Sequence, residues 1–151
     1  SPPAEASPLN EMTALETTLA DYHLSGITTG PHIMQHMRSE LRKRGVLSAA
    51  AVRAARNGRF VRTAGHVIVK QRPETAKGFF FLTLEDETGT SNAVLTPKQY
   101  RRFRIPLHRA SIIEIAGPLQ NVDDVVHVRV RELRSLVPSD ALPPTRDHRR
   151  G

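Results

Sequence analysis

Three consecutive acidic residues, Glu85, Asp86 and Glu87, place carboxylate oxygens close enough together to hold a divalent cation. They stand between an apolar run and the pair Thr88-Gly89, which is typical of a tight turn. An aspartate at a turn commonly accepts hydrogen bonds from backbone amides nearby. We therefore expect Asp86 to bond the amides of the turn rather than a metal ion.

Histidines offer a second possible metal site. His32 and His36 are four residues apart, a spacing that lets two imidazoles on one helix face chelate a metal, and His23 is a possible third ligand that no spacing marks. The chain has no cysteine, which excludes disulfides and thiolate metal sites. No Ser-His-Asp set or glycine-rich phosphate loop stands out. We expect no metal, no cofactor and no catalytic residue in this chain.

The stretch at 78–95 reads as a β-hairpin with bulky side chains on both faces. Alternation along its first strand puts three apolar side chains on one face: Phe80, Leu82 and Leu84. Phe79 and Phe81 then point the opposite way, next to Asn92 on the second strand. Open aromatic rings on a sheet can stack nucleic-acid bases. The alternative is that helices at the start of the chain cover these rings.

Basic side chains surround this hairpin in the sequence. The net charge is +7 and the isoelectric point is near 10.7, which suits a polyanionic partner. Lys70, Arg72 and Lys77 lie in the connection before the hairpin, and Arg129 and Arg131 alternate on the last predicted strand. Cations there would neutralise phosphates, and the alternative is an ordinary solvated surface.

A further basic cluster lies on a helix predicted from Pro97 to about His108. Its members are Lys98, Arg101, Arg102 and Arg104. Short exposed helices often carry such charge, and we expect these residues not to share a single side of the helix. The cluster is therefore left out of the predicted binding residues.

The hydrophobic pattern divides the chain into four parts. We expect a disordered linker at 1–9, a helical segment at 10–58, a β domain at 59–137 and a disordered tail at 138–151. The β domain should form a barrel, and the helical segment should pack on it. The helical segment contains two or three short helices, one of them with a stripe of Ile33, Met34, Met37 and Leu41. From residue 59 the period changes to two. Three strands, a helix and two more strands, the last at 125–136, is the order of a five-stranded OB-fold barrel, so we predict a mainly β fold.

Particular motifs carry a resemblance to a known family. The strand that ends Leu-Glu-Asp-Glu-Thr-Gly, followed by Thr-Ser-Asn-Ala-Val-Leu, resembles the OB-fold shared by bacterial C-family DNA polymerases and the anticodon-binding parts of class II tRNA synthetases. The stretch from Ala64 to Gly78 is more specific, and resembles the C-terminal OB region of the error-prone, DnaE-type translesion polymerase. The stretch from Asp21 to His32 is similar to the segment that leads into this region. The resemblance covers roughly Met12 to Leu136.

The resemblance implies a module that binds single-stranded DNA during translesion synthesis, with Phe81 and Asn92 at positions that contact bases in the synthetase relatives. The carboxylates of the polymerase active site belong to another part of that family's chain, so we expect no enzyme activity here. The alternative function is docking of other proteins of a mutasome. No apolar run approaches the roughly 20 residues of a membrane span. We expect a cytoplasmic monomer without a membrane anchor.

Overall fold

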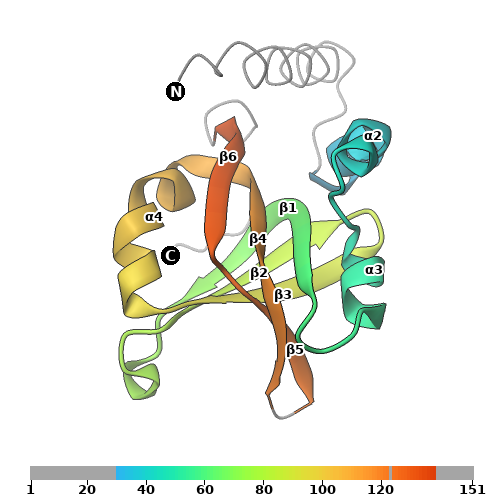
Figure 1. Cartoon of the computed structure of the whole chain (residues 1–151). Helices are drawn as coiled ribbons and strands as arrows, with labels where there is room; N and C mark the ends of the chain where they lie inside the picture. Colours follow the sequence, from blue (N-terminus) through green and yellow to red (C-terminus); the bar gives the residue numbers. More distant parts are fainter. Residues whose placement is uncertain (1–29, 123, 139–151) are drawn as a thin grey trace, which may run out of the picture.

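The computed structural model describes residues 30–122 and 124–138. Within that part of the chain, short helices precede a sheet of six strands, and a further helix follows the third strand (Figure 1). The lead at 1–9, the part of the predicted helical segment at 10–29 and the tail from residue 139 lie outside the described residues. The elements in chain order are α2 (Gly30–Lys43), α3 (Ala49–Ala54), β1 (Phe60–Gln71), the 3₁₀ helix η2 (Glu74–Ala76), β2 (Phe80–Asp86), β3 (Gly89–Leu95), α4 (Pro97–Arg109), β4 (Ala110–Val122), β5 (Val125–Arg129) and β6 (Glu132–Pro138).

Five of the strands close into a ring. Strands β1, β2, β3, β5 and β4 are hydrogen-bonded in that order, and β4 pairs again with β1. The pairing of β3 with β5 is parallel, and the other pairings in the ring are antiparallel. Strand β6 continues along an edge of β4. The predicted mainly β architecture, a five-stranded OB barrel preceded by short helices, is confirmed.

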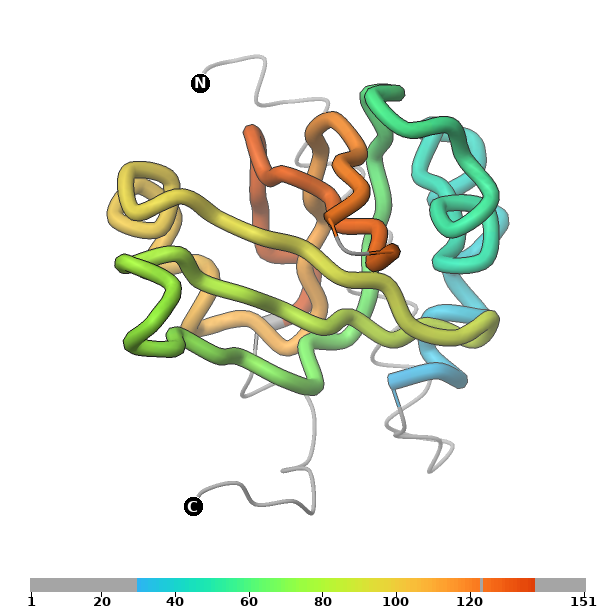
Figure 2. The backbone as a smooth tube through the Cα atoms, turned by 90° about the horizontal axis from the view of Figure 1, so that it is seen from below, coloured from blue at the N-terminus to red at the C-terminus, as the bar shows by residue number. Residues whose placement is uncertain are grey.

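Alternate side chains of the ring strands fill its interior. Phe80, Leu82 and Leu84 of β2 are each at most 4% exposed, as alternation predicts. Helix α4 closes one end of the barrel, where the ring of Tyr100 stacks on Phe80 with the centroids 4.6 Å apart. The helix forms despite Pro106 in its last turn. Figure 2 shows α4 at one end of the molecule and α2 and α3 at the other.

Strand β1 changes partner along its length. Residues 60–66 pair with β4, and residues 66–71 pair with β2. Gly65 lies at this change, and atoms of β2 come within 3.2 Å of the place where a Cβ would sit, so a glycine suits the bend. The pairing with β2 then shifts between Val67 and Val69. This β-bulge reverses the side of the sheet to which the following side chains point.

The prediction of one final strand at 125–136 is wrong. The chain forms two strands, β5 and β6, because it turns across β4 at Gly117. A Cβ on Gly117 would collide with the carbonyl oxygen of Arg129. The backbone N–H of Arg131 donates a hydrogen bond to the carbonyl of Ala116 at 2.7 Å. Glycine at this position therefore allows the close crossing that separates β5 from β6.

Helix α2 packs on the outside of the barrel. The predicted apolar stripe is at most 1% exposed and consists of Ile33, Met34, Met37 and Leu41. It forms a second core cluster with residues of β1, β4 and β6, among them Ala64 and Ile112. Helix α3 begins after Ser48, whose hydroxyl accepts a hydrogen bond from the backbone N–H of Ala51, as is typical of an N-cap residue. None of the described helices is long and apolar enough to cross a membrane.

Asp86 is buried at the end of β2 and links the hairpin to both helices. Its Oδ1 accepts hydrogen bonds from the backbone N–H and the hydroxyl of Thr88, each at 2.7 Å. Its Oδ2 accepts from the backbone N–H of Ala49 at 2.8 Å and from the guanidinium of Arg38 at 3.1 Å. The prediction that Asp86 bonds an amide of the turn is confirmed. The same carboxylate also holds α2 and the first turn of α3.

A second buried carboxylate, Glu114 of β4, lies among three arginines. Its Oε1 accepts from Arg44, which follows α2, at 2.6 Å and from Arg134 of β6 at 3.3 Å. Its Oε2 accepts from Arg62 of β1 at 3.0 Å. These contacts join α2, β1, β4 and β6 on the side of the barrel that α2 covers.

Candidate nucleic-acid interface

The outer face of β2, β3 and β5 carries two rows of side chains that cross the three strands. The first row, paired in register, is Phe81, Val94 and Arg129. The second row is Thr83, Asn92 and His127. Directly paired residues point to the same side of a sheet, and the residues between them along each strand are buried in the barrel. Both rows therefore point away from the core, and we call this surface the ring face.

Phe81 is half-buried and contacts the ring of His127. The ring centroids are 5.9 Å apart and the ring planes cross at 66°. Burial lowers the pKa of His127, against a hydrogen bond with the backbone of Val125 that raises it. The imidazole is therefore neutral at pH 7, and the two rings offer an uncharged aromatic surface of the kind on which bases stack. His127 is missing from the predicted site, although alternation on the last predicted strand places it on the same side as Arg129.

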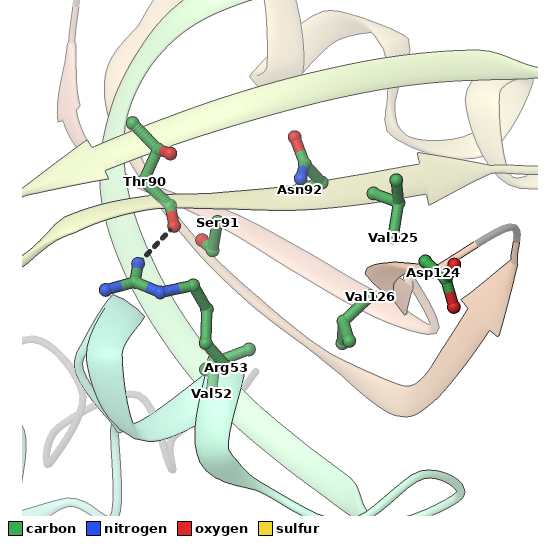
Figure 3. A pocket seen from close by; sticks show the side chains of 8 residues that line it. All are labelled: Val52, Arg53, Thr90, Ser91, Asn92, Asp124, Val125 and Val126. Carbon is green, nitrogen blue, oxygen red and sulfur yellow. Dashed lines mark hydrogen bonds between the residues drawn. The ribbon is translucent and has the colours of Figure 1, made fainter.

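Asn92 lines a groove of about 310 Å³ between β3, α3 and the turn from β4 to β5 (Figure 3). The other lining residues are Val52, Arg53, Thr90, Ser91, Asp124, Val125 and Val126. Arg53 donates a hydrogen bond to the carbonyl oxygen of Thr90 at 2.7 Å, which fixes the guanidinium at one end of the groove. The groove joins the ring face at Asn92, so a strand of nucleic acid on that face has room for part of a nucleotide there.

The described helices bury their apolar residues elsewhere than on the ring face. Helix α2 buries its stripe in the cluster that contains Ala64 and Ile112, and α3 contributes Val52 to the barrel core. Neither cluster includes Phe79 or Phe81, which are both half-buried. Helices α2 and α3 therefore do not cover these two rings with their apolar faces.

Lys77 and Phe79 lie in the connection between β1 and β2 rather than in the two rows. Lys77 is exposed and adopts a left-handed backbone conformation with φ of 55°, at the end of η2. The backbone N–H of Phe79 donates to the carbonyl of Ala76 at 3.1 Å. The intervening Gly78 lies against Pro97, the first residue of α4. Both side chains are thus at the end of the ring face that adjoins α4.

Lys70 and Arg72 lie on the other side of β1 from the ring face. Lys70 pairs with Leu82, whose side chain is in the core, because the β-bulge has reversed the alternation. The guanidinium of Arg72 lies 4.7 Å from the centroid of the Tyr100 ring. The structure therefore separates these two cations from Phe81 and places them beside α4.

Arg129 and Arg131 both point outward, as alternation predicts. Val130 between them is buried in the core. Arg129 is half-buried in the first row beside Val94. Arg131 is exposed and follows the end of β5, where the chain turns towards β6.

The expectation that the basic residues of α4 do not share a single side agrees with the helix geometry, because Arg102 and Arg104 are two residues apart and such residues do not face each other. Lys98, Arg101, Arg102 and Arg104 are all exposed, as are His108 and Arg109. Tyr100 and Leu107 are the buried residues of the helix. The spacing of these two apolar residues fixes the buried side of the helix, and the cations are spread over the exposed surface around it.

The chemistry of the ring face is stacking, hydrogen bonding and charge. No group of three or more His, Asp or Glu side chains in the described ranges is arranged to hold a metal ion. His32 and His36 lie on the exposed side of α2, and His23 falls outside those ranges. A surface of rings, an amide and a guanidinium suits a ligand with flat bases and phosphates.

Comparison with known protein families agrees with this geometry. The family model described as an OB-fold nucleic acid binding domain, of the tRNA anticodon type, matches residues 61–136, just over half of the 151 residues. The chain belongs to this OB-fold nucleic acid binding family. The match begins in β1 and ends in β6, so it covers the whole ring of strands.

The relatives of this OB-fold domain include error-prone DNA polymerases. Error-prone DNA polymerase 2 of Rhizobium meliloti (strain 1021) is 38% identical over 128 residues, which are 85% of this chain. The error-prone DNA polymerase of Brucella abortus biovar 1 (strain 9-941) is 40% identical over 127 residues, or 83% of this chain. The chain spans only 12% of the length of each of these relatives. The expected resemblance to the OB region of error-prone polymerases is confirmed.

A solved structure shares the OB fold at lower identity. Asparaginyl-tRNA synthetase from Pyrococcus horikoshii superposes on 62% of this chain with a TM-score of 0.52 and 21% identity, using 23% of its own length. Identity at this level supports the architecture alone.

Proposed function

We propose that this OB-fold domain is a non-catalytic module that binds single-stranded DNA for an error-prone DNA polymerase, and that it positions the template during translesion synthesis in the bacterial cytoplasm. The observation that carries the proposal is the first row of the ring face. There, Phe81 offers a ring to a base, and Arg129 on the same face offers a charge to a phosphate. The domain acts as a monomer and needs no cofactor for this binding.

The neighbours of the first row support the proposal. His127, neutral at pH 7, extends the aromatic surface of Phe81, and Asn92 adds an amide at the entrance to the groove. Both contacts tolerate many base sequences, because every base has a flat face and polar edges. This suits a module that must accept whatever template the polymerase copies.

Titration of a fluorescent single-stranded oligonucleotide tests the site. The double substitution Phe81→Ala with Arg129→Ala should weaken binding about tenfold or more, because one stacked base alone contributes about 1–3 kcal/mol. A matched control, Phe60→Ala with Arg42→Ala, removes an exposed ring and an exposed cation that lie elsewhere, and should change the affinity less than twofold. Equal affinities for the wild type and the Phe81 and Arg129 variant would refute the site. A wild type that binds no DNA even at low salt, but captures a mutasome protein, would favour a docking module instead.

A further inference from the structure

Positive charge is concentrated in two short segments of the chain. Residues 70–78 and 97–109 contain eight Lys and Arg residues and a single acid, Glu74. The chain as a whole has 22 basic and 15 acidic residues, so the rest of it is balanced at fourteen of each. The net charge of these two segments is therefore +7, equal to that of the whole chain.

These two segments are neighbours in space. The connection from β1 to β2 and helix α4 lie side by side at one end of the barrel in both views (Figures 1 and 2). Arg72 from the connection lies over the ring of Tyr100 in α4. Burial lowers the pKa of His108 in α4, and the charges of Lys70 and Arg104 lower it further. Cations from both segments thus converge on one surface.

The exposed side of α4 forms the centre of this surface. Lys98, Arg101 and Arg104 follow one another at intervals of three residues, and Arg109 lies in the last turn. A helix of this length extends about 20 Å. We call the cations of α4 together with Lys70, Arg72 and Lys77 the α4 surface.

The α4 surface has many cations, and a guanidinium lies over the rings of both Tyr100 and Phe103. Tyr100 is 8% exposed and lies beneath Arg72. Phe103 is half-buried, with the guanidinium of Arg102 at 5.1 Å from its centroid. The ring face has the opposite character, with rings and few cations. One surface suits bases, and the other suits phosphates.

We propose that the α4 surface binds the phosphate backbone of double-stranded DNA next to the single strand held on the ring face. This inference rests on the proposed function, because the proposed function places the single strand on the ring face. The surfaces adjoin, because β3 ends at Leu95 and α4 begins at Pro97. Duplex DNA carries about one charge per 1.7 Å along its axis, and it offers phosphates without unstacked bases. The domain would therefore hold a junction between single and double strands.

The test compares three DNA probes: a single strand, a blunt duplex, and a junction that joins the two. The variant Lys98→Gln, Arg101→Gln, Arg104→Gln removes three charges of α4 while glutamine preserves the helix. The matched control Arg42→Gln, Lys43→Gln, Arg56→Gln removes three exposed charges from the opposite end of the molecule. Circular dichroism and thermal unfolding confirm that both variants are folded.

The α4 variant should bind the junction and the duplex at least about tenfold more weakly at 0.1 M salt, with a salt slope smaller by about 2.7, because each duplex phosphate contact contributes about 0.9 to that slope. Its affinity for the single strand should change less than threefold. The control should lose less than threefold in affinity for every probe.

The proposal is overturned if the α4 variant binds the junction as tightly as the wild type or the control does, which would leave an acidic protein as the partner. It is also overturned if the α4 variant loses as much on the single strand as on the junction. A different result would refute the proposed function: the Phe81 and Arg129 variant would bind the single strand as tightly as the wild type does.

Discussion

Replacing Asp86 by alanine should lower the free energy of unfolding by about 3 kcal/mol or more, because removal of one partner from a buried ion pair typically costs about 3–5 kcal/mol. The side chain of Asp86 is 2% exposed and that of Arg38 is 10% exposed. Arg38 keeps its contact with Glu87, where Nε lies 2.7 Å from Oε2, so the loss falls at the lower end of the range. The hydrogen bond to Glu87, with the charges of Glu87 and Asp86, raises the pKa of Arg38. The guanidinium therefore stays charged and cannot relieve the loss by giving up its proton.

Urea denaturation followed by circular dichroism measures this loss as a lower midpoint at an unchanged slope. Glu85→Ala is the matched control, because Glu85 is the adjacent carboxylate on the outward side of the same strand. It should lose less than about 1 kcal/mol, as most surface substitutions do. Similar losses in the two variants would mean that Asp86 does not hold α2 and α3 to the barrel.

Glu114→Gln is the second substitution with a large expected effect, a loss of about 3 kcal/mol in the free energy of unfolding. The glutamine keeps the shape of the side chain but removes the charge that holds three guanidinium groups together. The carboxylate is 1% exposed, whereas Arg44, Arg62 and Arg134 are 16%, 35% and 40% exposed. The arginines would repel one another across the contact between α2 and the barrel.

The control for this substitution is Glu132→Gln. Glu132 also pairs with Arg62, but its side chain is 62% exposed, and an exposed pair contributes at most about 1 kcal/mol. Unfolding in urea at 0.1 M and 1 M NaCl separates the causes, because salt screens repulsion between the partly exposed arginines. The loss in Glu114→Gln should shrink at high salt. A loss no greater than that of Glu132→Gln would contradict the role of Glu114.

The periodic pattern of the sequence predicts most of the fold. Alternation at 78–95 identifies β2 and β3 and the buried side of each, and the three-and-four spacing identifies α2 and α4. The pattern does not predict the break between β5 and β6. That break depends on the close approach of Gly117 to the backbone of Arg129, which is a long-range contact without any local signal.

The sequence predicts only part of the candidate site, because an irregularity in β1 changes where two of the predicted residues point. The strand contains one extra residue opposite β2, so side chains beyond the bulge point the opposite way from those before it. Lys70 and Arg72 therefore lie beside α4, although the hairpin and its neighbours suggest a place beside Phe81. Phe81, Asn92 and Arg129 lie together because no irregularity interrupts β2, β3 or β5.

The partners of buried polar groups are the features that a single sequence predicts least well. The turn at Asp86 predicts its bond to a nearby amide, but nothing marks the contacts with Arg38 and Ala49, which are more than thirty residues away. Glu114 likewise appears as one polar residue in an apolar strand, and its arginines come from three other parts of the chain. Such contacts follow from tertiary packing rather than from local pattern.

The salt dependence of single-stranded DNA binding tests the central claim most directly. In a titration of an oligonucleotide from 0.05 M to 0.5 M salt, the logarithm of the wild-type affinity should fall linearly with the logarithm of the salt concentration, by about 0.7 for each phosphate contact. Arg129→Ala should reduce that slope by about 0.7, whereas Phe81→Ala should weaken binding at every salt concentration and leave the slope unchanged, since stacking on a ring releases no counterions. Absence of binding at the lowest salt, or a slope that Arg129→Ala leaves unaltered, would contradict the account of the ring face.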